Sequence, residues 1–348
     1  MDAIEREIWL TSLYTRDEKI ETIYFGGGTP SLLNAGELNQ LLTAIKNKFS
    51  VLKDAEITIE ANPDDINSES LEIWRSSGVN RLSIGIQSFD NAELKWMNRA
   101  HNADQSLNCI DLALNAGFEN FSVDLIYGSP MLDDQQWKKN IDIVISKKAP
   151  HISAYALTVE NNTALDKMIS TKRSAAIDPE KQARQFLLLL QVLENSGYEH
   201  YEISNFARSG MRSRHNSSYW ALTPAGEIKT YYGFGPAAHA FDGNRRKWNI
   251  ANNALYIQSL NQGKIPFEEE TLTPAQRLNE YIMTSLRTIE GLDLDHVSKY
   301  FSTDLCAELE TSAKRWLTSG KLRKTGQRLV LTNEGKLFAD GIAADMFI

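Results

Sequence analysis

Three consecutive glycines follow a short run of β-branched and aromatic residues near the start of the sequence. The run covers residues 20–25, and the glycines at 26–28 are followed by Thr29 and Pro30. Because glycine lacks a Cβ atom, its N–H and C=O groups can approach a small polar ligand closely, while the proline fixes the direction of a following helix. A tight turn that only needs positive φ is the simpler explanation of a lone glycine triplet. A binding role therefore depends on further motifs downstream.

Polar residues recur at the ends of the strand-like segments that follow. Glu60, Gln87 and Asp124 each lie in or at the end of such a segment, next to turn-forming residues. In a barrel of parallel strands joined by helices, the carboxyl ends of the strands all face the ligand. A single strand-end carboxylate or amide more often caps a turn, but a series of them at the same topological position indicates one binding mouth shared with the glycine loop.

Short strand-like runs alternate with amphipathic helix-like segments over the first 200 residues. This alternation predicts a parallel sheet with right-handed crossovers, either open or curled into a barrel. The predicted strands are 21–26, 56–61, 81–87, 121–127, 151–159 and 198–204. The predicted helices are 34–48, 67–77, 90–97, 104–116, 133–147 and 178–196, and the segments 160–176 and 208–230 are expected to be long loops.

Composition limits the class of protein. The 348 residues include 37 basic and 45 acidic side chains, and the resulting net charge of −8 argues against a general binder of nucleic acid or of anionic membranes. The longest apolar run, Phe186 to Leu190, is far shorter than the roughly 20 residues of a membrane span, and the N-terminus has no signal-peptide character. A cytoplasmic protein without an integral membrane segment is expected. The two cysteines, Cys109 and Cys306, predict neither a disulfide framework nor a cysteine metal site.

Five motifs taken together resemble the radical S-adenosylmethionine proteins related to oxygen-independent coproporphyrinogen oxidase, and within them the HemW-type haem chaperones. The motifs are Tyr-Phe-Gly-Gly-Gly-Thr-Pro-Ser (24–31), Ile-Glu-Ala-Asn-Pro (59–63), Ser-Ile-Gly-Ile-Gln-Ser-Phe (83–89), Asn-Arg-Ala-His-Asn (98–102) and Val-Asp-Leu-Ile-Tyr-Gly (123–128). The resemblance implies an α/β fold, a partial (β/α)₆ barrel that binds S-adenosylmethionine. It aligns these residues with the ligand-contacting positions of the family: Gly27, Gly28, Thr29, Glu60, Gln87, Arg99 and Asp124.

The resemblance also implies a [4Fe–4S] cluster that this chain does not provide for. In the family, a Cys-x₃-Cys-x₂-Cys loop after the first strand binds the cluster, and Cys109 and Cys306 cannot replace that triad. Because the other ligand motifs are intact, we expect a first strand and its loop to be missing upstream through a truncated gene model, rather than a true loss of the cluster. Strand 21–26 would then be an unpaired barrel edge, which favours aggregation or a homodimer.

A second group of residues lies beyond the predicted barrel. His215, Tyr219 and Trp220 fit a His-Asn-x-x-Tyr-Trp motif that resembles the chaperone branch of the family, where the histidine is a proposed haem ligand. An imidazole can ligate haem iron while flat aromatic rings cover the macrocycle. A hydrogen-bonded histidine beside core aromatic residues is the alternative interpretation. His239 is the second candidate for the ligand of the haem iron, but it is more simply interpreted as a residue that lines the pocket.

The last 76 residues predict a small separate domain. Thr273 and Pro274 begin a helix, two helical patterns follow at 293–301 and 304–319, and residues 327–332 read as a strand before a last helix. This arrangement resembles the winged-helix-like domain that closes the family's proteins. Its basic residues are interpreted as a solvated face rather than a DNA-binding one. The expected domains are 1–207 for the partial barrel, 208–272 for the haem motif and connecting region, and 273–348 for the C-terminal domain.

Three functions remain open from the sequence. The first is a haem chaperone that binds haem and delivers it to respiratory membrane proteins. The second is an oxygen-independent coproporphyrinogen III oxidase that decarboxylates propionate side chains by radical chemistry. The third is a cluster-less protein that binds S-adenosylmethionine or a similar ligand without turnover. The His-Asn-x-x-Tyr-Trp motif and the chain length favour the first.

Overall fold

A computed structural model describes residues 1–12, 19–220, 222 and 228–348 of the chain. The described residues form two compact units, each assembled from segments that are far apart in the sequence. The first unit comprises residues 1–23, 33–56 and 214–348, and the second comprises residues 24–32 and 57–213.

The second unit contains most of a seven-stranded sheet with the order β1-β2-β3-β4-β5-β7-β6. Pairing is parallel from β2 through β5, as the βα alternation predicted, which confirms the α/β fold class. The strands are β1 (Lys19–Phe25), β2 (Ser50–Ala61), β3 (Arg81–Gln87), β4 (Phe121–Tyr127), β5 (His151–Ala156), β6 (Glu199–Glu202) and β7 (Asn205–Ala207). Among the described residues, β1 and β6 are the edge strands of this sheet.

The prediction of a single parallel strand over residues 198–204 was wrong. The segment folds as an antiparallel hairpin of β6 and β7, and β7 in turn pairs antiparallel with β5. The reversal is stabilised by the Glu202 carboxylate, which accepts hydrogen bonds from the Ser204 backbone N–H at 3.1 Å and the Asn205 side-chain amide at 2.7 Å. A carboxylate that bonds the chain two and three residues further on favours a turn over a continuing strand.

Six helices follow the strands in the order that the sequence predicted. Each begins and ends within one residue of its predicted bounds, because most begin at an Asn or Asp whose side chain caps the first turn. They are α2 (Ala35–Lys48), α3 (Ser68–Ser77), α4 (Asn91–Trp96), α5 (Ala103–Asn115), α6 (Asp134–Ser146) and α8 (Pro179–Asn195). The expected loop 160–176 contains one short helix, α7 (Ala164–Ser170).

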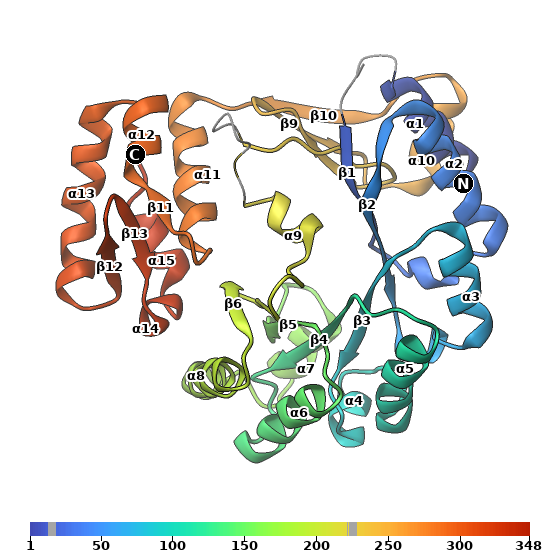
Figure 1. The fold of residues 1–348 in the computed structure, drawn as a ribbon, viewed down its shortest axis with the longest axis horizontal. Helices are drawn as coiled ribbons and strands as arrows, with labels where there is room; N and C mark the ends of the chain where they lie inside the picture. Colours follow the sequence, from blue (N-terminus) through green and yellow to red (C-terminus); the bar gives the residue numbers. More distant parts are fainter. Residues whose placement is uncertain (13–18, 221, 223–227) are drawn as a thin grey trace. The chain divides into compact units, whose positions relative to one another are not determined.

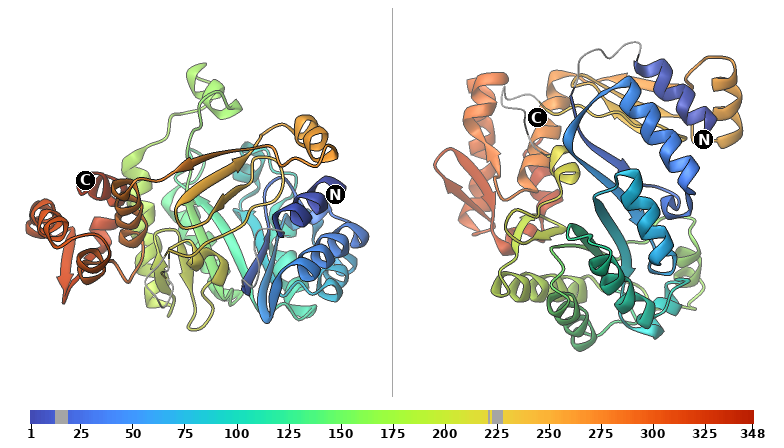
Figure 2. Two further views of the ribbon diagram at one scale, coloured as in Figure 1. Left: turned by 90° about the horizontal axis from the view of Figure 1, so that it is seen from above. Right: turned by 45° about the vertical axis from the view of Figure 1, so that its right-hand side comes forward.

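In the strands of the second unit, apolar and polar residues alternate, and successive side chains point to opposite faces of the sheet. Ile59, Leu82 and Val123 point to one face, where they are fully buried, and α3 to α6 and α8 lie along the outer side of the strands (Figure 1). Further views show the same arrangement (Figure 2). The opposite face carries Glu60, Ser83 and Asp124, which alternate with the apolar residues. The sheet therefore has a polar inner face on which a ligand site can be built.

In the first unit, a buried carboxylate joins three elements and a loop. Glu7 in α1 (Asp2–Ser12) accepts hydrogen bonds from the Gly235 N–H at 2.9 Å, from the Asn249 side chain at 2.6 Å and from the Tyr256 hydroxyl. Burial raises the pKa of Glu7, although the three hydrogen bonds oppose that shift. Asn249 ends β9 (Arg245–Asn249), which pairs with β8 (His239–Phe241) and β10 (Phe267–Thr271), and Tyr256 lies in α10 (Asn253–Asn261).

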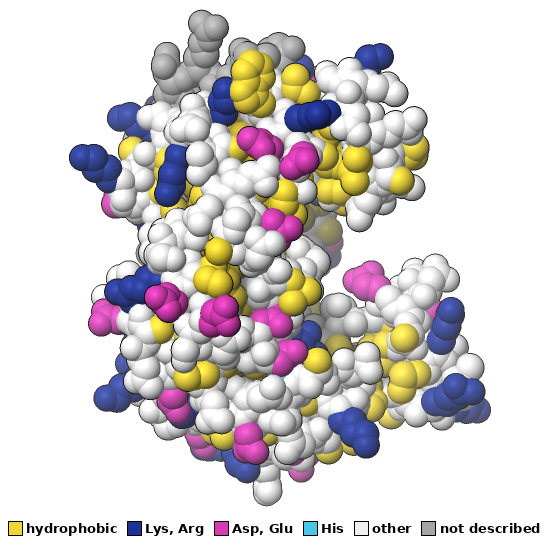
Figure 3. Space-filling view, turned by 90° about the vertical axis from the view of Figure 1, so that its right-hand side faces the viewer, with side chains coloured by type: hydrophobic (Ala, Val, Ile, Leu, Met, Phe, Trp, Pro, Cys, Tyr) yellow, Lys and Arg dark blue, Asp and Glu magenta, His cyan; other side chains and the backbone are white. Residues whose placement is uncertain are grey.

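The C-terminal segment of the first unit has the expected helices and strand, together with two further short strands, β11 (Leu292–Asp293) and β12 (Leu322–Thr325), and two short helices in place of the single last helix. Its elements are α11 (Pro274–Leu286), β11, α12 (Leu294–Tyr300), α13 (Thr303–Thr318), β12, β13 (Arg328–Leu331), α14 (Asn333–Lys336) and α15 (Ala339–Asp345). Several of its basic side chains pair with carboxylates, including Lys324 with Glu310 at 2.6 Å. On the face of the molecule drawn in Figure 3, basic and acidic side chains are likewise interspersed. Within the described residues, no helix is both long and apolar enough to cross a bilayer.

Candidate functional site

The three glycines after β1 have different structural roles. A Cβ atom at Gly26 would lie 2.5 Å from the Tyr24 ring and 2.9 Å from a Glu60 carboxylate oxygen, so this position has no room for a side chain. Gly27 and Gly28 have φ of +78° and +64°, and a Cβ atom there would meet nothing within 4 Å. The loop therefore presents open backbone, as the sequence predicted for a ligand-binding loop.

Glu60 in β2 holds this loop in place. Its carboxylate accepts hydrogen bonds from the Gly27 N–H at 3.1 Å and from the Tyr24 hydroxyl at 2.8 Å. Burial, followed by the charges of Glu60 and Asp124, raises the pKa of Tyr24, which therefore remains a protonated hydrogen-bond donor. Thr29, the exposed residue after the glycines, accepts a backbone hydrogen bond from Leu32 at 3.1 Å and so begins the short 3₁₀ helix η1 (Pro30–Leu32).

Asp124 lies on the same face of the sheet as Glu60. Ser83 is the register partner of Glu60 in the next strand, and its hydroxyl donates to Asp124 at 3.0 Å. Ser122 donates to the same carboxylate at 3.1 Å. Burial raises the pKa of Asp124, while hydrogen bonds from serine hydroxyls oppose the shift. These serines belong to none of the predicted site residues, although their alternation with apolar residues is visible in both strands.

Gln87 and Arg99 approach each other over Gly85. A Cβ atom at Gly85 would lie 3.1 Å from the Gln87 amide nitrogen and 3.4 Å from an Arg99 guanidinium nitrogen. Gln87 has a left-handed φ of +65°, and the register of β3 against β4 shifts between Ile84 and Gln87. Such strained positions gather at functional sites, where they aim a side chain.

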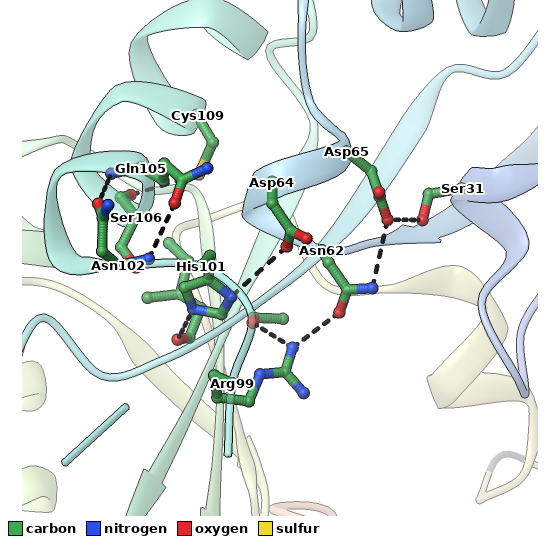
Figure 4. Close-up of polar contacts among 12 residues, drawn as sticks. Ser31, Asn62, Asp64, Asp65, Arg99, His101, Asn102, Gln105, Ser106 and Cys109 are labelled. Atoms are coloured by element: carbon green, nitrogen blue, oxygen red, sulfur yellow. Dashed lines mark hydrogen bonds and ion pairs between the residues drawn. The ribbon is translucent and has the colours of Figure 1, made fainter. Parts of the chain in front are cut away.

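Arg99 is fixed by two neutral acceptors. Its Nη2 donates to the Asn62 side-chain oxygen at 2.7 Å and to the Gly85 carbonyl at 3.1 Å (Figure 4). The buried Nε of Arg99 has no hydrogen-bond partner within the described residues. Burial lowers the pKa of Arg99, and the nearby Asp64 opposes this. A half-buried cation whose acceptors are both neutral is a suitable partner for a ligand carboxylate.

The cysteines do not fit an iron–sulfur cluster. The Cys109 thiol is buried in α5 and contacts the Ser106 carbonyl at 3.3 Å, and burial raises its pKa to about 12. Cys306 lies in α13, within the other compact unit. In the part of the chain that the structure describes, no three His, Cys, Asp or Glu side chains are grouped as metal ligands. A [4Fe–4S] cluster needs thiolates that these residues do not supply.

His215 lies in the first unit, in the five-residue helix α9 (Arg214–Ser218). Its Nδ1 is 2.9 Å from the Thr22 hydroxyl, and its Nε2 is 3.1 Å from the Tyr219 hydroxyl. The Glu56 carboxylate accepts hydrogen bonds from the backbone N–H groups of Arg214 and His215 at 3.0 and 2.9 Å. The start of the helix, and with it the imidazole, is therefore fixed to β2.

Aromatic rings continue from His215. Tyr219 meets His215 edge-on at 5.2 Å between ring centroids and Tyr231 at 5.0 Å, and Trp220 contacts Tyr219 at 6.4 Å. The structure thus brings together the three predicted haem residues. His239 is exposed in β8, where its ring lies against Trp248 at 6.5 Å. Of the expected loop 208–230, residues 221 and 223–227 lie outside the described residues.

Comparison with known proteins identifies the family. The radical SAM superfamily model matches residues 3–144, and the HemN C-terminal domain model matches residues 272–338. The heme chaperone HemW of Bacillus subtilis is 30% identical over 98% of this chain and 89% of its own length. The heme chaperone HemW of Lactococcus lactis is 32% identical over 91% of this chain and 82% of its own length. The chain belongs to the HemW family of radical S-adenosylmethionine proteins.

The HemW family assignment confirms the resemblance, the radical SAM half-barrel and the C-terminal domain that the sequence predicted. A solved structure of the coproporphyrinogen III oxidase HemN from Escherichia coli superimposes with a TM-score of 0.85. That likeness covers 99% of this chain and 82% of the other at 22% identity, so it shows a common fold. The binding roles of the seven barrel residues and of His215, Tyr219 and Trp220 stay predictions.

Proposed function

We propose that this HemW-family chain is a haem chaperone that binds haem through His215 and delivers it to respiratory membrane proteins. The names of its relatives support haem as the cargo. The observation that carries the proposal for this chain is the pair of hydroxyl groups on the His215 ring, because a hydroxyl that accepts from one ring nitrogen leaves the lone pair of the other nitrogen for iron.

Iron ligation requires a neutral imidazole with a lone pair on the nitrogen that faces the metal. If Nδ1–H donates to the Thr22 hydroxyl at 2.9 Å, the lone pair lies on Nε2, which is 3.1 Å from the Tyr219 hydroxyl. Haem iron would replace the Tyr219 hydroxyl at Nε2, at the loss of one hydrogen bond with a net value of about 1 kcal/mol. The rings of Tyr219, Trp220 and Tyr231 are suited to cover an apolar macrocycle.

Titration of haem into the purified chain tests this proposal. We expect a histidine-ligated Soret spectrum that His215→Ala weakens strongly. His239→Ala is the matched control, because His239 is an exposed histidine against a different ring, and it should weaken the spectrum much less. An unchanged spectrum in His215→Ala would remove the ligand assignment, and equal losses in both variants would make it non-specific.

We further propose that the polar inner face of the barrel binds S-adenosylmethionine. The residue set fits this ligand: open glycine backbone for its methionine end, Glu60 and Asp124 for ammonium or ribose hydroxyls, and the Arg99 guanidinium, held by neutral acceptors, for its carboxylate. Bound S-adenosylmethionine would supply a sulfonium-linked adenosyl group, whose reductive cleavage needs an electron that the residues of this chain cannot deliver. We therefore assign to these residues binding and orientation alone.

A cluster-less binding protein is the second candidate function, because Cys109 and Cys306 do not form a thiolate triad. Anaerobic reconstitution with iron and sulfide distinguishes the possibilities for the chain as given. We expect no stoichiometric [4Fe–4S] absorbance, because the buried Cys109 thiol is bonded to its own helix and remains protonated. A stoichiometric cluster would contradict the cysteine argument.

A further inference from the structure

We propose that Asn62 and Asp65 are positioning residues that hold Arg99 in place and leave its charge available for a ligand carboxylate. This inference rests on the proposed S-adenosylmethionine site and adds to it a specificity mechanism. The residues Ser31, Asp65, Asn62 and Arg99 are linked in that order by hydrogen bonds, and we call them the Arg99 network (Figure 4).

The distances in the Arg99 network define each link. The Ser31 hydroxyl donates to Asp65 Oδ2 at 2.5 Å, and the Asn62 Nδ2 donates to the same oxygen at 3.3 Å. Asn62 Oδ1 then accepts from Arg99 Nη2 at 2.7 Å. Asn62 and Asp65 are both half-buried, and they flank and end the short 3₁₀ helix η2 (Pro63–Asp65), which holds them at a fixed spacing.

Asp65 determines which way the Asn62 amide faces. An ionised carboxylate can only accept hydrogen bonds, so the amide must present its NH₂ group to Asp65. The amide oxygen then faces Arg99, which can only donate. A neutral amide at position 65 could donate as well as accept, and the orientation of Asn62 would no longer be determined.

Because residue 62 is a neutral asparagine, the positive charge of Arg99 is not neutralised by its hydrogen-bond partner and remains available to a ligand. Arg99 is held by an amide oxygen and by the Gly85 carbonyl, and neither acceptor carries a formal charge. Asp65 does not bond Arg99 directly, and Asp64 faces His101 at 3.8 Å. Because a direct carboxylate partner would neutralise the guanidinium, asparagine both positions the cation and leaves its charge for the ligand.

The Arg99 network also connects the cation to the glycine loop. Ser31 lies in η1, three residues after Gly28, and shares the Asp65 carboxylate with Asn62. One carboxylate therefore fixes both the end of the loop and the amide that holds Arg99. Loop and cation are pre-organised together, which lowers the entropic cost of binding a ligand that touches both.

The binding of two related ligands distinguishes a positioning role of Asn62 and Asp65 from a general contribution of these residues to stability. The probes are S-adenosylmethionine and its decarboxylated analogue, which keeps the sulfonium, the adenosine and the amine. Calorimetry on the full chain should show about tenfold preference for S-adenosylmethionine, as expected for one charge-assisted contact. Asn62→Asp, Asn62→Ala and Asp65→Asn should each lower this preference at least about threefold, while affinity for the analogue changes less than about twofold.

The analogue serves as an internal measure of folding, and Asp142→Asn is the matched control. Asp142 is an exposed carboxylate on α6 that pairs with Lys138 at 2.6 Å, and its loss should leave the preference unchanged. If Arg99→Ala abolishes the preference but Asn62→Asp and Asp65→Asn do not lower it, the positioning role is overturned and the ligand site stands. If the unmodified chain binds neither probe, or both equally, the ligand site and the positioning role both fail.

Discussion

The two candidate sites differ in how their central side chains are held. Arg99 lies beside strand ends, and its guanidinium bonds a backbone carbonyl and an amide that is itself fixed by a carboxylate. His215 lies on a five-residue helix, and both of its ring nitrogens face hydroxyl groups. The first arrangement is pre-organised for a ligand of defined shape, whereas the second can exchange a hydroxyl partner for another ligand. The difference agrees with the proposed roles, in which the Arg99 site holds a cofactor and the His215 site holds a cargo that is passed on.

The strongest test of the comparison is removal of the Arg99 charge. Arg99→Ala should weaken S-adenosylmethionine binding by about 10- to 100-fold, since a hydrogen bond to a charged group contributes about 1.5–3 kcal/mol. Arg75→Ala is the control, because Arg75 is an exposed arginine that bonds the Ala116 carbonyl. Calorimetry measures both, and equal affinities of the two variants would show that the barrel site does not depend on its cation.

Replacement of the hydroxyl groups around His215 should have smaller effects of opposite sign. Tyr219→Phe removes the partner that iron must displace, so haem affinity should rise by roughly fivefold for one hydrogen bond of about 1 kcal/mol. Thr22→Val removes the acceptor for Nδ1–H and should lower haem affinity by a similar factor. Both are followed by Soret titration. Changes of the same sign would contradict the assignment of Nε2 as the iron ligand.

The pH dependence of stability compares two carboxylates of the barrel unit, Glu93 and Glu199, whose pKa values are shifted in opposite directions. Burial raises the pKa of Glu93, which accepts hydrogen bonds from Ser88 and Ser129, so its contribution to stability is full below pH 4.5 and is lost as pH rises through the folded pKa. Glu93→Gln should therefore gain stability over the unmodified chain as pH increases from 4.5 to neutral. Urea unfolding at both pH values measures the difference.

Glu199 provides the control of opposite sign for the Glu93 experiment. Hydrogen bonding to Arg212 lowers the pKa of Glu199, so its contribution is present above pH 4.5 and is lost as pH falls through the folded pKa. Glu199→Gln should therefore lose stability at neutral pH and little at acid pH. Parallel pH profiles of the two variants would refute the different environments assigned to these carboxylates.

The smallest expected effect comes from Gly85. A methyl group there would lie 3.1 Å from the Gln87 amide and 3.4 Å from Arg99, and both are flexible side-chain ends that can shift by a few tenths of an ångström. Gly85→Ala should lower S-adenosylmethionine affinity by only about two- to threefold, which corresponds to roughly 0.5 kcal/mol. Gly341→Ala, whose added Cβ meets nothing within 4 Å, is the control. A loss as large as that of Arg99→Ala would mean that Arg99 cannot adjust.

The sequence predicted the barrel elements well because their signals are local. Asn34, Asn67, Asn102 and Asp133 each cap the helix that follows, which explains the agreement of the helix bounds. The β6–β7 hairpin was missed because two hydrogen bonds accepted by the Glu202 carboxylate, rather than a glycine or proline, stabilise its turn.

Long-range placement could not be predicted in the same way. The motifs identified Glu60, Arg99 and His215, but the Arg99 network depends on pairing between residues 31, 62, 65 and 99, which periodicity does not reveal. Similarly, the proximity of Thr22 to His215 spans 193 residues. The compact units combine separated segments for the same reason, since tertiary contacts between distant residues define them.

The buried carboxylate of Glu7 has a consequence for the order in which the chain is made. Its partner Tyr256 is 249 residues further along, and Gly235 and Asn249 are 228 and 242 residues away. A ribosome that adds roughly 5–20 residues per second needs about 12–50 s to cover that separation. During this interval α1 can pack on α2, through contacts such as that of Gln40 with Glu5 at 2.7 Å, but the Glu7 carboxylate lacks its native hydrogen-bond donors until the last third of synthesis begins.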